Sequence, residues 1–382
     1  MKISSIPILH LILFGLTLML ISCNEPKKKI KEDENNDESK TLIKYAKGFD
    51  IQLYKGYTKL IIKSPYPDAT QYQEFILVSD KKMDFDGDFK IYVPVKKLVA
   101  TSTTHIPMIE ILDETNSLIG FPTTNYISSK KTIERVKLGK VKDLGNEQDF
   151  NTEVLISLQP EVMIAFSMGK SSKLYENIEK NGIPVIYNGD WLEDSPLGRA
   201  EWIKFFGALY DKNEEADSIF RAIELEYLNA KKIALQAEKK PTIMSGVLYK
   251  DKWNLPAGES FTAQLYQDAN ADYLWKASEG QGSLVLSFET VFEKAEKAEY
   301  WIGSGYYTSL EEVAAANAHY QQFETFKTKE IYSFSKRRSE NGGVEYFEFG
   351  PLQPDVVLKD LIKVVHPELL PGYEPYFLQK LD

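Results

Sequence analysis

The chain has 382 residues and a net charge of −10, with 43% of its residues hydrophobic and 27% charged. This composition is ordinary for a globular protein, and at about 150 residues per domain the length predicts two domains. The acidic balance argues against a nucleic-acid partner, which would require a basic face.

The first 22 residues have the pattern of a secretory signal peptide. After a short basic start, the apolar run 6–21 is shorter than the ~20 residues that a membrane-spanning helix needs. Cys23, the only cysteine, follows the small residue Ser22 and resembles the acylated cysteine of the lipobox in bacterial lipoproteins, although Ile21 stands where Ala or Ser is commoner. The resemblance implies that residues 1–22 are removed and that Cys23 carries palmitate or related acyl chains. The alternative is a chance cysteine within a signal peptide.

A polar tether and a β-rich segment are predicted next. Residues 23–44 are assigned to a lipidated tether, because 24–40 are polar or charged apart from Pro26 and Ile30 and cannot form a core; ordered sequence is expected from near Thr41. Residues 45–212 are assigned to an N-terminal lobe that begins with the β-rich segment 47–95. Two alternating runs around a glycine turn predict a hairpin over 49–63.

From Leu98 onward, short apolar strands alternate with helices, which predicts a mostly parallel sheet with helices on its faces. Residues 213–239 then repeat apolar side chains at helical spacing, and a helix of this length would extend roughly 38 Å. Because that is long for one domain, we expect a rigid helix that joins two lobes. The alternation restarts in residues 240–382, the predicted C-terminal lobe. The predicted fold class is therefore α/β, with two parallel-sheet lobes, one connecting helix and an extra N-terminal β-rich segment.

A weak internal repeat places one glutamate at the start of a helix in each lobe. Glu153 follows Asn151 by two positions, and Glu289 follows Ser287 by two positions. An acid in the first helical turn also offsets the helix dipole, so the repeat alone does not establish a function.

Several catalytic and metal-binding patterns are absent from the sequence. The run 169–171 resembles half of a P-loop, but Ile164 stands where the full motif needs glycine. His105, His319 and His366 are far apart in sequence, and no histidine-rich loop exists, so we expect neither a metal site nor a cofactor. No nucleophile-elbow serine or zinc-protease helix is present, and we expect no enzymatic activity.

Residues that follow predicted strands are the best candidates for ligand contact, because ligands of open α/β sheets bind outside the carboxyl ends of the strands. The aromatic candidates are Phe166, Trp191, Trp253, Tyr306 and Tyr307. The polar candidates are Thr104, His105, Arg337 and Arg338. Aromatic side chains are more often part of a core, and an arginine pair is as often solvated, so these alternatives stay open.

The order of several segments resembles one family. The segments are 99–105, 151–164, 182–185, 196–204, 215–216, 354–361 and 366–368. Together they are similar to the cobalamin/iron-siderophore class of ABC-transporter substrate-binding proteins, in the subgroup carried as lipoproteins. Glu161 departs from this pattern, because the family prefers aspartate there.

The resemblance implies two lobes around one ligand, with one surface glutamate per lobe docked on the ABC permease of the inner membrane. Glu153 and Glu289 match those docking positions. The expected function is capture of a ferric siderophore, or a related iron or corrinoid chelate, by a monomeric, exported, membrane-anchored lipoprotein whose folded part is periplasmic or at the cell surface. The alternatives are a cobalamin or haem receptor of the same fold, an anchored enzyme acting on a metal chelate, and a surface binder with no importer.

Overall fold

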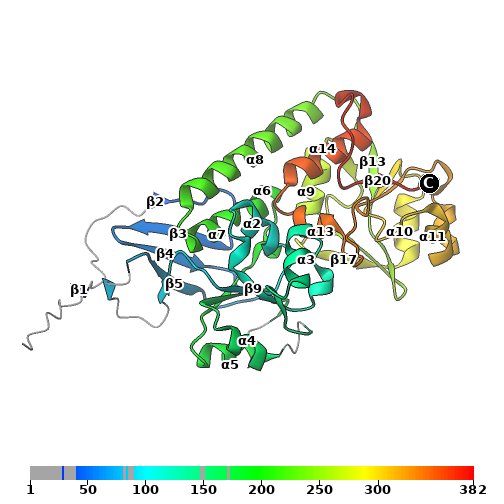
Figure 1. Ribbon diagram of the computed structural model, residues 1–382. Coiled ribbons are helices and arrows are strands. Elements are labelled where there is room, and N and C mark those ends of the chain that lie inside the picture. Colours follow the sequence, from blue (N-terminus) through cyan, green and yellow to red (C-terminus); the bar gives the residue numbers. More distant parts are fainter. Residues whose placement is uncertain (1–27, 30–39, 81–82, 85–89, 147–150, 170–172) are drawn as a thin grey trace, which may run out of the picture.

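A computed structural model describes residues 28–29, 40–80, 83–84, 90–146, 151–169 and 173–382. The predicted signal peptide, Cys23 and most of the predicted tether lie outside the described residues, as do two positions of the P-loop-like run. The chain folds into two α/β lobes, and helix α8 (Asn213–Ala234) runs along one side of the molecule between them (Figure 1). The predicted fold class is confirmed.

The first lobe is built on a parallel sheet with the strand order β10-β9-β8-β11-β12. Its strands are β8 (Leu98–Ala100), β9 (Leu118–Phe121), β10 (Lys142–Asp143), β11 (Val162–Ala165) and β12 (Val185–Tyr187). Consecutive side chains of a strand point to opposite faces. In β11, Val162 and Ile164 enter one hydrophobic core while Met163 and Ala165 enter another, so both faces of the sheet are buried.

Helices cover both faces of this sheet, as is usual for parallel sheets. They are α2 (His105–Ile111), α3 (Lys130–Lys137), α4 (Thr152–Leu158), α5 (Lys173–Lys180), α6 (Pro196–Glu201) and α7 (Ile203–Leu209). Short 3-10 turns are η1 (Thr115–Ser117), η2 (Thr124–Tyr126) and η3 (Asp190–Leu192).

The β-rich segment forms a five-stranded sheet of its own, with the order β2-β3-β4-β5-β7. Its strands are β2 (Lys40–Thr41), β3 (Phe49–Tyr54), β4 (Tyr57–Ile62), β5 (Gln73–Val78) and β7 (Lys90–Tyr92). The predicted hairpin is β3–β4, paired antiparallel. Phe49, Ile51 and Leu60 are fully buried in the same core as Leu98 and Ile164, so this sheet extends the first lobe. A short parallel pair joins β1 (Lys28–Lys29) to β6 (Met83–Asp84).

Helix α8 connects the two cores through successive parts of its length. Ala216 and Phe220, near its start, belong to the core of the first lobe. Tyr227, Ala230 and Ala234, near its end, belong to the core of the second lobe. The helix ends at Ala234, before the predicted residue 239, and the next residues form turns instead.

The second lobe is built on a sheet with the order β16-β13-β18-β19-β20, parallel except for its last strand. Its strands are β13 (Thr242–Met244), β16 (Asp272–Tyr273), β18 (Tyr300–Ile302), β19 (Ile331–Ser333) and β20 (Gln379–Lys380). The helices are α9 (Phe261–Asp268), α10 (Phe288–Ala295), α11 (Leu310–Ala316), α12 (Glu324–Lys327), α13 (Glu345–Phe349) and α14 (Pro354–Val365), with the turns η4 (Ala318–Gln322) and η5 (Pro367–Leu369).

An antiparallel sheet of the second lobe was not predicted. It consists of β14 (Val247–Tyr249), β15 (Lys252–Pro256) and β17 (Ser283–Leu286). The sequence predicted one strand over 242–249, but Gly246 divides it, with φ of +83°. A Cβ at Gly246 would lie 2.0 Å from the carbonyl oxygen of Asn254, so only glycine allows this close approach of two strands.

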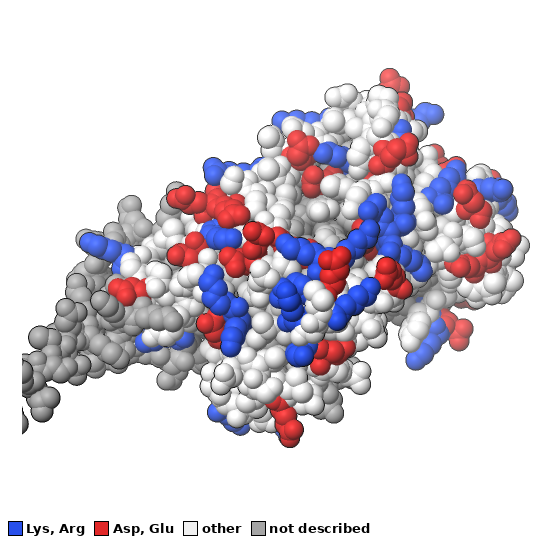
Figure 2. All heavy atoms as spheres, in the orientation of Figure 1, with Lys and Arg blue, Asp and Glu red and all other residues white. Residues whose placement is uncertain are grey.

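Basic and acidic side chains are intermixed on the face of the molecule shown in Figure 2. The net charge of −10 therefore does not form one continuous acidic surface on that face. Within the described ranges, no helix is both long and apolar enough to cross a membrane.

Candidate ligand-binding cleft

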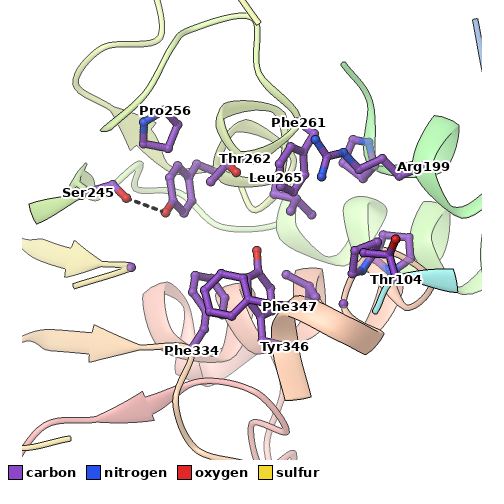
Figure 3. Close-up of a pocket in the computed structure, with 18 of the residues that line it drawn as sticks. Thr104, Arg199, Ser245, Pro256, Phe261, Thr262, Leu265, Phe334, Tyr346 and Phe347 are labelled. Carbon is purple, nitrogen blue, oxygen red and sulfur yellow. Dashed lines mark hydrogen bonds between the residues drawn. The ribbon is translucent and has the colours of Figure 1, made fainter. Parts of the chain in front are cut away.

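One cavity, of about 290 Å³, lies where the two lobes meet (Figure 3). The first lobe contributes Thr104, at the carboxyl end of β8, and Arg199 from α6. The second lobe contributes most of the wall, which is largely aromatic or aliphatic. Those wall residues include Phe261, Leu265, Tyr266, Phe334, Tyr346, Phe347 and Val357. We call this space the central cavity.

Two further cavities share residues with the central cavity. The Phe166 cavity, of about 370 Å³, lies between 101–103 of the first lobe and 342–348 of the second, and shares Phe347 with the central cavity. The Trp191 cavity, of about 300 Å³, shares Arg199 and Phe261 with the central cavity. The three spaces therefore adjoin one another at the junction of the lobes, and we call them together the cleft.

Arg199 is fixed at the boundary between the central cavity and the Trp191 cavity. Its Nη2 donates to the carbonyl oxygen of Trp191 at 2.6 Å, and its Nε donates to that of Glu193 at 3.3 Å. Its guanidinium carbon lies 3.5 Å from the ring centroid of Phe261, which is a cation–π contact. Burial lowers the pKa of Arg199 to about 10, so the side chain stays charged at neutral pH.

A buried carboxylate lies next to this arginine. Asp190, in η3, is 2% exposed. Burial raises the pKa of Asp190, while the Thr104 hydroxyl and the Arg199 guanidinium favour its charged form. Asp190 lines none of the three cavities, so the cleft offers the Arg199 cation within mainly apolar walls, with a buried acid near it.

Tyr346 presents a further polar group to the central cavity. Its ring stacks on Phe334, with the two centroids 3.9 Å apart, and its hydroxyl points into the cavity in Figure 3. Burial raises the pKa of Tyr346 to about 12, so the hydroxyl is protonated at neutral pH and can donate a hydrogen bond to a ligand.

Four of the predicted contact residues lie on the cleft. Thr104 lines the central cavity, Phe166 and Tyr306 line the Phe166 cavity, and Trp191 lines the Trp191 cavity. The rings of Phe166 and Trp191 contact each other, with centroids 5.6 Å apart, although they follow different strands. Ligand contact by these four residues stays a prediction.

Trp253 and His105 do not reach the cleft, and their predicted positions are corrected. Trp253 is fully buried in the second core, where its ring packs on Trp301 at 5.5 Å. His105 is fully buried against Phe206, and burial lowers its pKa to about 3. The sequence predicted both residues on loops after strands, but Trp253 lies within β15 and His105 begins α2, and both side chains point into a core.

The predicted arginine pair lies beside the cleft and lines none of these cavities. Arg337 pairs with Glu345, with Nε and Oε2 2.7 Å apart, and stacks on Tyr376 at 4.2 Å. Arg338 donates to the carbonyl oxygen of Tyr306. Arg338 therefore supports the loop that carries Tyr306. Tyr307 is partly buried against the second core.

The sequence interpretation missed Arg199, Phe261, Phe334 and Tyr346. Phe334 directly follows strand β19, so the rule that singled out Phe166 could have found it. Arg199 falls within the segment 196–204, which carried the resemblance, but nothing in its spacing indicates that it faces the other lobe.

Both predicted docking glutamates are exposed at helix starts, as the sequence indicated. Glu153 lies in the first turn of α4, which Asn151 caps, and Glu289 lies in the first turn of α10, which Ser287 caps. Hydrogen bonds from its own backbone N–H and from the Ser287 hydroxyl lower the pKa of Glu289.

Among the described residues, no group of three or more His, Cys, Asp or Glu side chains could hold a metal ion.

Comparison with known proteins agrees with this architecture. The family model described as "Periplasmic binding protein" matches residues 98–337. An uncharacterised lipoprotein of Methanocaldococcus jannaschii is 26% identical over 367 residues, which cover 89% of this chain and 86% of that protein. A second uncharacterised lipoprotein of the same organism is 22% identical and covers 96% of each chain.

Solved structures share the fold at low sequence identity. A possible iron-binding, periplasmic solute-binding protein from Staphylococcus epidermidis has a TM-score of 0.56 and 17% identity, covering 72% of this chain and 99% of that one. A periplasmic haem-binding protein from Pseudomonas aeruginosa has a TM-score of 0.54 and 14% identity, covering 75% and 98%. Since the family model covers more than half of the sequence and the two-lobed fold agrees with it, the chain belongs to the periplasmic binding protein family.

Proposed function

We propose that this protein captures a ferric siderophore or a related iron chelate in the cleft and delivers it to an ABC importer. The observation that carries the proposal is the cleft at the junction of the lobes. Both lobes contribute aromatic walls to its Phe166 and Trp191 cavities, and the second lobe contributes those of the central cavity. Ligand sites are typically concave and mainly apolar, with a few polar groups that fix orientation. Arg199 and Tyr346 are such groups here.

The comparisons support the choice of ligand class. The structural relatives from Staphylococcus epidermidis and Pseudomonas aeruginosa are named as iron-binding and haem-binding proteins. Haem is the second candidate, because the cleft is lined by flat rings and Tyr346 directs a hydroxyl into it. No covalent step is needed for either ligand, and the protein would bind and release its cargo without turnover.

We further propose that the protein is exported and anchored through acylated Cys23, which the two lipoproteins of Methanocaldococcus jannaschii support by analogy. Several acyl chains hold a protein on a membrane far more firmly than one chain. Glu153 and Glu289 would then dock the two lobes on the permease.

Tryptophan fluorescence, titrated with ferric siderophores, haem and cobalamin, tests the ligand assignment. Trp191 is the tryptophan that lines the cleft, whereas Trp202, Trp253 and Trp301 are fully buried. A saturable, one-to-one change with one of these ligands is expected. A flat response to all of them would refute the assignment, and chemical conversion of a bound chelate would favour the enzyme alternative.

A further inference from the structure

A short segment before the β-rich sheet crosses the junction of the two lobes. We call residues 42–48 the strap. Tyr45, at its centre, packs against both the first core and the second core. Its hydroxyl also donates to Glu224 of helix α8 at 2.5 Å. The strap therefore contacts both lobes and the helix that connects them.

Glu201, the last residue of α6, holds the first half of the strap. It is fully buried, and its carboxylate accepts hydrogen bonds from the backbone N–H groups of Lys44, Tyr45 and Ala46, at 2.9, 2.6 and 2.9 Å. Lys204 completes the site, with Nζ 3.0 Å from Glu201 and 2.8 Å from the carbonyl oxygen of Leu42. A buried charge with this many donors is well satisfied.

Glu193 holds the second half of the strap and also touches the cleft arginine. Its carboxylate accepts from the backbone N–H groups of Lys47 and Gly48 at 2.9 and 2.8 Å, and from Trp202 Nε1 at 3.0 Å. Its own carbonyl oxygen accepts from Arg199 Nε at 3.3 Å. Glu193 thus contacts the strap with its side chain and Arg199 with its main-chain carbonyl group.

The neighbouring contacts strengthen the same connection. Lys47 pairs with Asp194 at 2.5 Å, and Asp194 also accepts from Gln281 of the second lobe at 3.2 Å. Gly48 and Gly198 leave no space around Glu193, because a Cβ on either residue would lie 3.0 or 3.2 Å from its carboxylate oxygens. The segment 190–199, which comprises η3, the turn after it and the start of α6 and which we call the loop 190–199, is therefore enclosed between the strap and the cleft.

We propose that the strap is a positioning element of the binding cleft, in which Glu193 and Glu201 hold the loop 190–199 so that Arg199 stays at the boundary of the central and Trp191 cavities. Glu193 and Glu201 touch no ligand in this scheme and act through Arg199. The inference rests on the proposed function for the ligand, but the strap geometry is independent of the ligand. The strap also includes the last residues of the predicted tether, which therefore end at the junction of the lobes.

The test compares Glu193→Gln with Asp360→Asn in the full chain. Asp360 is the matched control, because it is fully buried and accepts from the backbone N–H groups of Tyr376, Phe377 and Leu378, but within the second lobe. We expect Glu193→Gln to accelerate amide hydrogen exchange over 190–199 at least about tenfold. We expect Asp360→Asn to leave that segment at the wild-type rate, even where its global stability is lower.

Ligand affinity is the second measurement, because it would not change if Glu193 only stabilised the fold. For whichever of haem, cyanocobalamin or a ferric siderophore binds the wild type, we expect Glu193→Gln to weaken binding about fivefold or more and Asp360→Asn to leave it within twofold. If none of these probes binds the wild type, the proposed function fails, while the exchange comparison still decides the role of the strap.

Unchanged exchange over 190–199 in Glu193→Gln, or equal acceleration in both variants, would overturn the inference. If Glu193→Gln does not fold, Gly48→Ala replaces it. Its new methyl group would press on Glu193 and on Trp202, 2.9 Å away, without removing a charge. The same pattern, with at least about threefold faster exchange over 190–199, is then expected.

Discussion

Glu348 accepts a hydrogen bond of 2.9 Å from the backbone N–H of Ser129, although the two residues belong to opposite lobes. The second oxygen of Glu348 accepts from the N–H of Ser128 at 2.6 Å. Ser129 caps helix α3, so the carboxylate lies at a helix N-terminus, where the dipole favours negative charge. Glu348 also lines the Phe166 cavity, and this contact joins the lobes within the cleft.

We expect the Glu348 contact to make stability depend on pH. Burial raises the pKa of Glu348 to about 8. The nearby Glu110 and Glu345 also raise this pKa, whereas the hydrogen bonds from Ser128 and Ser129 lower it. Between the unfolded pKa and 8, the folded protein holds a proton that the unfolded chain has lost. The free energy of unfolding therefore falls as the pH rises through this window, by up to about 1.4 kcal/mol per pH unit.

The control for this prediction is Glu348→Gln, which cannot titrate. Urea unfolding at pH 5, 6.5 and 8 should show the wild type losing stability relative to Glu348→Gln as the pH rises. A difference between the two proteins that stays constant over the three pH values would contradict the assignment.

Removal of Arg199 should lower the stability of the protein, because the buried Asp190 beside it then lacks a positive charge. Arg199→Ala leaves the buried Asp190 without its nearby positive charge and removes the contact with Phe261, so we expect a loss of roughly 2–4 kcal/mol in the free energy of unfolding. Adding Asp190→Asn should recover about 1 kcal/mol or more, because the uncompensated acid is gone. Chemical denaturation of the single and double variants measures this, and strictly additive losses would exclude the coupling.

The corrected position of Trp253 gives a separate prediction. Trp253→Phe removes ring contacts in the core and the hydrogen bond from Nε1 to the carbonyl oxygen of Ser245, so we expect it to lose about 1–3 kcal/mol of stability while ligand affinity is retained. Trp191→Phe should do the reverse, with small loss of stability and affinity reduced about threefold or more. Denaturation and binding curves of both variants check this. Weaker binding by Trp253→Phe, with unchanged binding by Trp191→Phe, would contradict the position of Trp253 outside the cleft.

Charge reversal at the predicted docking positions should separate binding from transport. We expect Glu153→Lys and Glu289→Lys to bind ligand normally but to reduce uptake in cells, most strongly in the double variant, because both side chains are exposed and away from the cleft cavities. Glu311→Lys is the matched control, since it also reverses an exposed acid in the first turn of a helix. Normal uptake by the double variant would refute docking through these residues.

The layered architecture was predictable because it depends on local patterns. Buried runs such as Val162–Ala165 and the helical period of α8 are visible within a few neighbouring residues. The role of Arg199 was not predictable, because it depends on Phe261 and Asp190, and the two lobes bring Phe261 to it from far along the sequence. Trp253 was misplaced because it lies on an antiparallel sheet, to which the rule about strand ends does not apply.

The position of the β-rich segment also required the structure. Alternation predicted the β3–β4 hairpin, but alternation does not say which core receives Phe49 and Ile51. The strap is held by Glu193 and Glu201, which lie about 150 residues away in sequence. The sequence contains 56 Asp and Glu residues, and nothing in it distinguishes these two buried acids from exposed ones.

Calorimetric titration of a cavity-filling variant tests the central claim most directly. Thr262→Trp places a large ring where the central and Trp191 cavities meet, and Gln267→Trp places the same ring on the exposed side of helix α9. We predict that one ligand among ferric siderophores, haem and cobalamin binds the wild type and Gln267→Trp one-to-one with a Kd of about 1 µM or lower, and that Thr262→Trp does not bind it measurably. Equal binding by all three proteins, or binding by none, would contradict the proposed cleft.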